Sequence, residues 1–292
     1  MKTTLDCVPC FMRQALEAMR FSTDDVSLQQ RFMREIFLCA ADLDFAQPPP
    51  SFAQKIHRRL REITDVKDPY LKVKQSFNRL ALKMLPQIEH TIGEADDPFA
   101  MAVKFAIAGN IIDSGAKAAL SESEVLETLN KTVAMPLLGD TDSFKKAVNN
   151  ATDILYLTDN AGEIVFDRLL INFLPKGRTV LAVKGCPVIN DALIADAEAA
   201  GLTKLIKVIE NGSDAPGTIL EDCSAEFIEI FKNADIIISK GQGNYETLSG
   251  RTENIFFLLK VKCPPIAADI GFPPGSHVLL ENLRKKSQKI SN

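Results

Sequence analysis

The sequence contains no tryptophan, and none of its apolar runs is long. Without tryptophan, no function can depend on a Trp platform that stacks a base or a sugar. No stretch approaches the roughly 18 consecutive apolar residues of a transmembrane helix. Residues 1–7 also lack the apolar segment of a secretory signal. We therefore expect a cytoplasmic protein without a membrane partner.

The charge balance shows no basic surplus. The 292 residues carry a formal net charge of -4 and have a pI of about 5.6, whereas nucleic-acid-binding proteins usually show a basic patch or stripe. A short basic tail, Arg284-Lys285-Lys286 with Lys289, is typical of a solvated helix end. No nucleic-acid partner is expected, and the chain is long enough for one large globular domain or two smaller ones.

Cysteine and histidine are few and scattered. The six cysteines stand at positions 7, 10, 39, 186, 223 and 263, and the three histidines at 57, 90 and 277. In the absence of a secretory signal, this favours reduced thiols or metal ligation over a disulfide framework. Cys7 and Cys10 form one CxxC motif, half of a zinc site or a redox pair, for which Cys263 is the best third thiol. No Ser-His-Asp spacing supports covalent acyl chemistry.

The first half of the chain has a helical pattern. Its apolar residues recur at the three-to-four-residue spacing of amphipathic helices. The expected helices cover residues 10–20, 27–38, 51–63, 68–86 and 97–108. Ser27 is the expected cap of the second helix. We predict an all-helical N-terminal domain, a bundle or cap, over residues 1–145.

From residue 146 onward, short apolar runs alternate with helical patterns. The expected strands cover residues 154–157, 179–184, 205–209, 234–239, 255–259 and 266–268, with a helix at 163–174. This alternation is typical of a parallel sheet, whose interior strands are apolar on both faces. The predicted fold class is α/β: a Rossmann-like α/β/α parallel-sheet domain over residues 146–292, preceded by the all-helical N-terminal domain.

Several predicted strands end in polar residues. Asp159, Asn160 and Glu163 follow the first strand, and the loops after the next three cover residues 184–191, 210–218 and 240–246. In a parallel sheet these ends share one rim, where α/β proteins bind ligands. The sequence therefore predicts a functional site at this rim.

Asp159, Asn160 and Asp191 offer oxygen ligands of the kind that Mg²⁺ or Mn²⁺ prefers. Such a metal can clamp a phosphate and activate a water. The alternative interpretation of Asp159-Asn160 is an Asx turn that caps the next helix. The spacing alone does not decide between the two.

Lys240-Gly241-Gln242-Gly243-Asn244 is a glycine-rich turn after a strand. Its exposed N–H groups and its lysine suit a phosphate, although it matches neither a Walker loop nor a dinucleotide motif. The alternative is a tight turn with an exposed lysine. The segment Gly109-Asn110-Ile111-Ile112-Asp113 is, on its own, a capping or turn feature.

Five motifs together resemble the damage-control phosphatase family, formerly domain of unknown function 89. The likeness is closest to its archaeal and bacterial branch with an N-terminal CxxC, and it covers nearly the whole chain. The motifs are Asp6 to Cys10, Gly109 to Asp113, Thr158 to Glu163, Val183-Lys184 through Asn190-Asp191, and Ser239 to Glu246.

The resemblance implies a divalent-metal-dependent phosphatase that acts on small phosphorylated metabolites, such as sugar phosphates, phosphopantetheine or related damaged metabolites. The implied cofactor is Mn²⁺, Ni²⁺, Co²⁺ or Mg²⁺. Carried over by position, the metal ligands are Asp159, Asn160 and Asp191, the catalytic residues Asp159, Glu163 and Lys240, and the substrate-binding residues Asn110, Asp113, Lys184, Gly241 and Asn244. Asp196 is the alternative third ligand, because Asp191 precedes Ala192-Leu193 rather than a small residue and a threonine.

Two other functions and one other mechanism stay open. The first is a nucleotide- or S-adenosylmethionine-dependent transferase, which the lack of a glycine-rich loop after the first strand disfavours. The second is a non-enzymatic metal-binding regulatory protein that uses Cys7 and Cys10. Within the phosphatase hypothesis, an aspartyl-phosphate at Asp159 is the alternative to direct attack by water. The sequence does not determine the oligomeric state.

Overall fold

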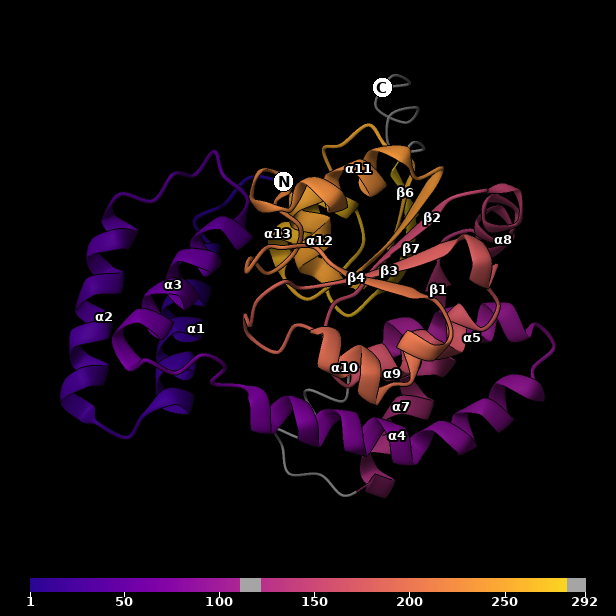
Figure 1. Cartoon of the computed structure of the whole chain (residues 1–292), viewed down its shortest axis with the longest axis horizontal. Coiled ribbons are helices and arrows are strands. Elements are labelled where there is room, and N and C mark those ends of the chain that lie inside the picture. Colours follow the sequence, from indigo (N-terminus) through magenta and orange to yellow (C-terminus); the bar gives the residue numbers. More distant parts are fainter. Residues whose placement is uncertain (111–121, 283–292) are drawn as a thin grey trace.

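The computed structural model describes residues 1–110 and 122–282 (Figure 1). Asp113 and the basic tail at residues 284–289 lie outside these ranges. The N-terminal helices are α1 (Cys7–Ser22), α2 (Val26–Ala41), α3 (Pro49–Thr64), α4 (Leu71–Gly93), α5 (Pro98–Ala108) and α7 (Glu122–Ala134). These positions confirm the five helices predicted from the sequence. The cap of α2 is Asp25 rather than Ser27, and α4 continues past the expected stop at Pro86.

The second part of the chain builds a sheet of seven strands. They are β1 (Leu137–Leu138), β2 (Ile154–Leu157), β3 (Thr179–Val183), β4 (Lys207–Glu210), β5 (Ile236–Lys240), β6 (Ile255–Lys260) and β7 (His277–Glu281). The helices between them are α8 (Thr141–Asn150), α9 (Glu163–Ile171), α10 (Ile194–Ala199), α11 (Ala225–Asn233), α12 (Gly241–Leu248) and α13 (Pro264–Ile270). The predicted strand at 266–268 is wrong. Those residues belong to α13, because Pro264 starts a helical turn that Gly271 ends in a left-handed conformation.

The strand order is β1-β7-β6-β5-β2-β3-β4, and only the β6–β7 pair is antiparallel. The mixed α/β class and the mainly parallel sheet are thereby confirmed. The chain runs outward from β2 through β3 to β4, and then returns to the other side of β2 with β5. The crevice beyond the carboxyl ends of β2 and β5 is therefore a topological switch point, where open α/β sheets bind ligands.

The strands are buried on both faces, as the apolar runs predict. In β2, Ile154 and Tyr156 face one hydrophobic core, and Leu155 and Leu157 face the other. This is the two-residue period of a strand. Helices α4, α5, α9 and α10 cover the first face, and α11, α12 and α13 cover the second (Figure 1). The result is a three-layer α/β/α arrangement.

Helices α1, α2 and α3 form a separate unit beside the sheet (Figure 1). This unit, called here the α1–α3 unit, has a core of its own that includes Phe11, Phe32, Phe52, Ile56 and Leu60. In contrast, α4 and α5 contribute to the core of the sheet. The hydrophobic cores thus divide the chain near residue 70, while the predicted division at residues 145 and 146 stays a prediction. Within the described residues, no helix has both the length and the apolarity needed to span a membrane.

His57 makes the stability of the α1–α3 unit depend on pH. Its side chain is buried in α3, and burial, with the nearby Arg61 charge, lowers its pKa from 6.5 to about 3. In the unfolded chain His57 therefore becomes protonated as the pH falls through 6.5, whereas in the folded chain it stays neutral until the pH approaches 3. The contribution of neutral His57 to the free energy of unfolding is therefore fully present above pH 6.5 and is lost as the pH falls toward 3.

We expect His57 alone to remove about 2.5 kcal/mol of unfolding free energy between pH 7 and pH 4.5. Urea unfolding of the wild type and of His57→Gln at both pH values measures this difference. The variant should lack that part of the acid destabilisation. An equal loss in both proteins would contradict the prediction.

Candidate active site

The predicted rim residues come together where β2 and β3 end. Asp159 and Asn160 follow β2, and the loop after β3 folds back over them. The amide of Ala161 donates to the Asn190 carbonyl at 2.8 Å, and the amide of Ala192 donates to the Asp159 carbonyl at 2.9 Å. Asn160 and Asp191 thereby pair as an antiparallel bridge. Backbone hydrogen bonds thus hold all three predicted metal ligands side by side.

Buried carboxylates concentrate negative charge at this point. Asp159, Glu163 and Asp191 are 8%, 3% and 3% exposed. Burial, followed by repulsion from Glu163 and Asp191, raises the pKa of Asp159 well above its ordinary value. Burial also raises the pKa of Asp191 to about 6, although the Lys184 charge opposes the shift. The charges of Asp159 and Asp191 are therefore poorly compensated by the protein alone.

Lys240, the last residue of β5, contacts Glu163 of this cluster and is completely buried. Its ammonium donates to Glu163 Oε1 at 2.7 Å, to Asp167 Oδ1 at 2.5 Å and to the Ala106 carbonyl at 2.6 Å. Burial alone would lower the pKa of Lys240, but the two carboxylates outweigh it and raise that pKa. Lys240 is the predicted phosphate contact, but all three N–H donors of its ammonium are already hydrogen-bonded to groups of the protein.

Asp167 and Tyr156 belong to this network and were not predicted from the sequence. The Tyr156 hydroxyl donates to Asp167 Oδ1 at 2.8 Å, and burial raises the pKa of Asp167 to about 6. Both residues lie within apolar runs. The signal in the sequence is the four-residue spacing of Glu163 and Asp167, which places two carboxylates on one face of a mainly apolar helix.

Gly241 is required by its closeness to Asp159. It has φ of 81°, and a Cβ at this position would lie 2.1 Å from Asp159 Cγ. Any other residue would displace the carboxylate. The glycine after Lys240 thus makes room for Asp159 at the start of α12.

The remaining predicted residues surround the same place. Lys184 donates to the Gly217 carbonyl, and its Nζ lies 3.5 Å from Asp191 Oδ2. Asn110 donates to Glu163 Oε2 at 3.1 Å. Asn244 donates to the carbonyls of Thr158 at 3.0 Å and Lys240 at 2.8 Å, so it ties the ends of β2 and β5 together. Asp113 lies outside the described residues.

Asp196, the alternative third ligand, already has hydrogen-bond partners at the start of α10. It accepts hydrogen bonds from Asn78 Nδ2 at 2.6 Å and from the Leu193 amide at 2.8 Å, at the start of α10. The Asn78 oxygen in turn accepts from the Gly162 amide at 2.7 Å. Asn78, which was not predicted, thus links Asp196 to the turn before α9.

The donor chemistry fits a divalent cation at Asp159, Asn160 and Asp191. Asp191 Oδ2 is buried, and the described residues give it no hydrogen bond; its nearest counter-charge is the Lys184 ammonium at 3.5 Å. The described part of the chain holds no group of three His, Cys, Asp or Glu side chains arranged for a metal, and the predicted set consists of two carboxylates and one carboxamide. All six cysteines are free thiols. A hard cation would satisfy the orphaned oxygen and offset the buried charge.

Comparisons with known proteins agree with this geometry. The family model of the damage-control phosphatase ARMT1-like domain matches residues 3–278. A damage-control phosphatase of Archaeoglobus fulgidus is 35% identical, and the match covers 95% of this chain and 98% of that protein. A damage-control phosphatase of Pyrococcus horikoshii is also 35% identical, with 97% and 99% covered.

An uncharacterized protein of Methanocaldococcus jannaschii is 37% identical, and the match covers 94% of each chain. The crystal structure of a DUF89 family protein from Pyrococcus horikoshii superposes with a TM-score of 0.89 at 34% identity, over 97% of this chain and 99% of that chain. The motifs, the fold and the full-length matches agree, and the chain therefore belongs to the damage-control phosphatase ARMT1-like family.

Proposed function

We propose that this protein is a divalent-metal-dependent phosphatase that hydrolyses small phosphorylated metabolites. The observation that carries the proposal is the charge balance at the switch point. Four buried carboxylates, Asp159, Glu163, Asp167 and Asp191, accompany two buried ammonium groups, those of Lys184 and Lys240. When all are ionised, two negative charges are left, which is the charge that one divalent cation neutralises. The names of the relatives support the phosphatase activity.

Asp159, Asn160 and Asp191 would hold the cation by their side-chain oxygens. When bound, such a cation lowers the pKa of a coordinated water and polarises a phosphate oxygen. Preferred metals, by the resemblance, are Mn²⁺, Ni²⁺, Co²⁺ and Mg²⁺. We propose that Lys184, which lies beside Asp191, and Asn110, which lies beside Glu163, contact the substrate phosphate. The start of α12 at Gly241 adds N–H groups that favour an anion.

Lys240 and Asn244 have a different place in the proposal. Because the Lys240 ammonium already has three acceptors, a direct phosphate contact requires one of them to be exchanged. We propose that Lys240 acts chiefly by orienting Glu163 and by supplying positive charge to the site where the phosphate would bind. Asn244 holds the β2 and β5 ends at their spacing.

The experiment that tests the substrate class is phosphate release from a panel in the presence of added Mn²⁺, Ni²⁺, Co²⁺ or Mg²⁺. The panel contains sugar phosphates, nucleotides, phosphopantetheine and p-nitrophenyl phosphate. We expect release from several small monoesters and a clear ranking among them. Absence of release from every compound, with each of the four metals, would overturn the proposed function and would favour the transferase or the thiol-based binding protein.

A further inference from the structure

The loop that carries Lys184 and Asp191 contains a strained residue. This loop, residues 184–193, places Ile189 at φ of 44°, in the left-handed region that β-branched residues rarely adopt. Such a conformation costs free energy and persists only where the surroundings impose it. Asp191 follows two residues later. Contacts that hold Ile189 therefore also restrain the short stretch of backbone that carries the Asp191 carboxylate.

The α1–α3 unit supplies the contacts that hold the loop. Ile189 packs against the hydrophobic core of that unit. The small space at this contact is lined by His57, Leu60 and Tyr70, among others. Next to it, Arg61 of α3 donates from Nη1 to the carbonyl of Pro187 at 2.7 Å. One side chain and one backbone carbonyl of the loop are thus fixed by the same unit.

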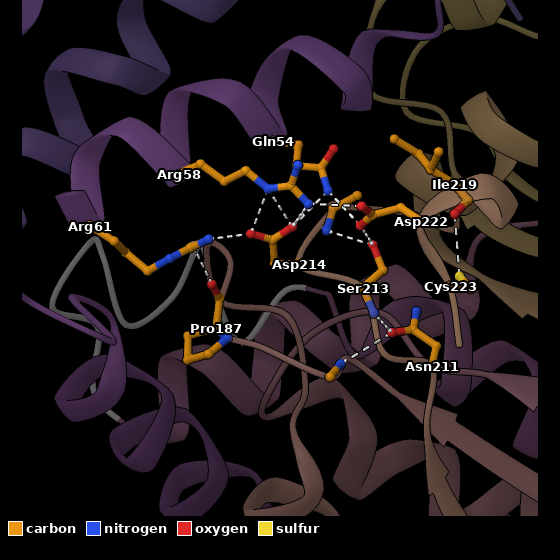
Figure 2. A network of polar contacts seen from close by, with 12 residues as sticks. Gln54, Arg58, Arg61, Pro187, Asn211, Ser213, Asp214, Ile219, Asp222 and Cys223 are labelled. Atoms are coloured by element: carbon orange, nitrogen blue, oxygen red, sulfur yellow. Dashed lines mark hydrogen bonds and ion pairs between the residues drawn. The ribbon is translucent and has the colours of Figure 1, made fainter. Parts of the chain in front are cut away.

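Arg61 is itself anchored by the loop that follows β4 (Figure 2). Its Nη2 donates to Asp214 Oδ2. Asp214 Oδ1 also accepts from Arg58 Nη2 at 2.6 Å and from Gln54 Nε2 at 2.6 Å. The same two side chains reach Asp222, Gln54 at 2.7 Å and Arg58 at 2.8 Å. Side chains on one face of α3 therefore bind both the loop after β3 and the loop after β4.

These two loops also touch each other directly. Asn211 Oδ1 accepts from the amides of Gly185 at 3.1 Å and Ser213 at 2.9 Å. A Cβ at Gly185 would lie 2.5 Å from Gly212 Cα, so the two backbones are in contact. A displacement of either loop would move the other.

We propose that Arg61 and Ile189 are positioning residues, through which α3 fixes the 184–193 loop and aims Asp191 at Asp159. The α1–α3 unit is then a fixed support of the rim. The inference rests on the proposed function in one respect, because it takes Asp191 to be a metal ligand. It adds that metal affinity depends on residues of the α1–α3 unit that do not touch the metal.

The test compares Arg61→Ala with Arg59→Ala. Both arginines lie on α3, but Arg59 donates to Glu35 at 2.5 Å and to Glu62 at 2.9 Å, inside the α1–α3 unit. The first measurement is Mn²⁺ affinity by titration calorimetry. We expect Arg61→Ala to bind Mn²⁺ at least about 10-fold more weakly, as is usual when a residue that supports a ligand is lost. Arg59→Ala should stay within about twofold of the wild type.

The second measurement is hydrogen exchange of the Asp191 and Ala192 amides in metal-free protein. These amides donate to the Val188 and Asp159 carbonyls, and they should exchange at least about 10-fold faster in Arg61→Ala than in Arg59→Ala. Unchanged exchange would overturn the inference. If the wild type neither binds Mn²⁺ nor releases phosphate, the proposed function fails, while the exchange result still decides whether Arg61 holds the loop.

Two further variants keep the test possible if Arg61→Ala does not fold. Ile189→Asn introduces a residue that tolerates positive φ and removes the apolar contact. Arg61→Lys keeps the charge, but an ammonium lacks the planar fork that spans two acceptors. Both should weaken Mn²⁺ binding and speed exchange in the loop. Wild-type values in both would contradict the proposed role of the α1–α3 unit.

Discussion

Replacement of Lys240 by methionine is expected to lower the free energy of unfolding by about 3–5 kcal/mol. The substitution keeps an unbranched side chain of similar length but removes the positive charge. Asp167 and Glu163 would then be buried without their shared partner, and the Ala106 carbonyl would lose its donor. Urea unfolding at pH 7 measures the change.

Two controls separate the buried charge from a general effect of the substitution. Lys232→Met removes an exposed lysine from α11 and should cost less than about 1 kcal/mol. The double variant Lys240→Met with Asp167→Asn should recover part of the loss, because it removes one of the unpaired charges. A loss in Lys240→Met no larger than that in Lys232→Met would show that the network adds nothing to stability.

The glycine-rich motif predicts a phosphate contact for Lys240, whereas the structure adds a structural role. The two roles give different kinetic results. A lysine that touches the phosphate changes KM when it is removed, while one that orients Glu163 mainly lowers kcat. The kinetics of Lys240→Met should be measured at a temperature at which an unfolding curve shows that the variant is still folded.

Asp159→Asn should abolish metal-dependent phosphate release while the protein stays folded. The variant keeps the size of the side chain and removes the charge that lies nearest to Asn160 and Gly241. We expect kcat to fall by more than about 100-fold, the upper end of the loss for a residue that only supports a metal ligand. Phosphate release with Mn²⁺ checks this loss.

The matched control is Asp153→Asn, at the opposite end of β2. Asp153 is exposed and far along the strand from the rim, so its variant should keep wild-type activity. The metal-free Asp159→Asn protein should also unfold at the same or a higher temperature than the wild type, because one of three mutually repelling carboxylates is gone. Full activity in Asp159→Asn would remove Asp159 from the site.

The sequence predicted the sheet and its rim well because both depend on local patterns. Apolar runs mark strands that are buried on both faces. Polar residues directly after β2 and β5 mark the rim, and parallel topology brings them together. The structure places Asp159, Asn160 and Asp191 side by side, as this reasoning implies, while their role as ligands stays a prediction.

The parts that the sequence did not predict depend on long-range packing. Amphipathic spacing shows that a helix has an apolar face, but it does not say what that face covers. For this reason the sequence does not reveal that α4 and α5 pack in the core of the sheet, while α1, α2 and α3 share another core. The buried acid Asp167 was hidden inside an apolar run, and its partner Lys240 lies 73 positions away.

The measurement that tests the central claim most directly is phosphate release by protein stripped with a chelator, before and after addition of Mn²⁺, Co²⁺, Ni²⁺ or Mg²⁺. The proposed site requires that release be absent from the stripped protein and return with at least one of these metals. Release that is the same with and without chelator would contradict a metal-dependent reaction at Asp159, Asn160 and Asp191.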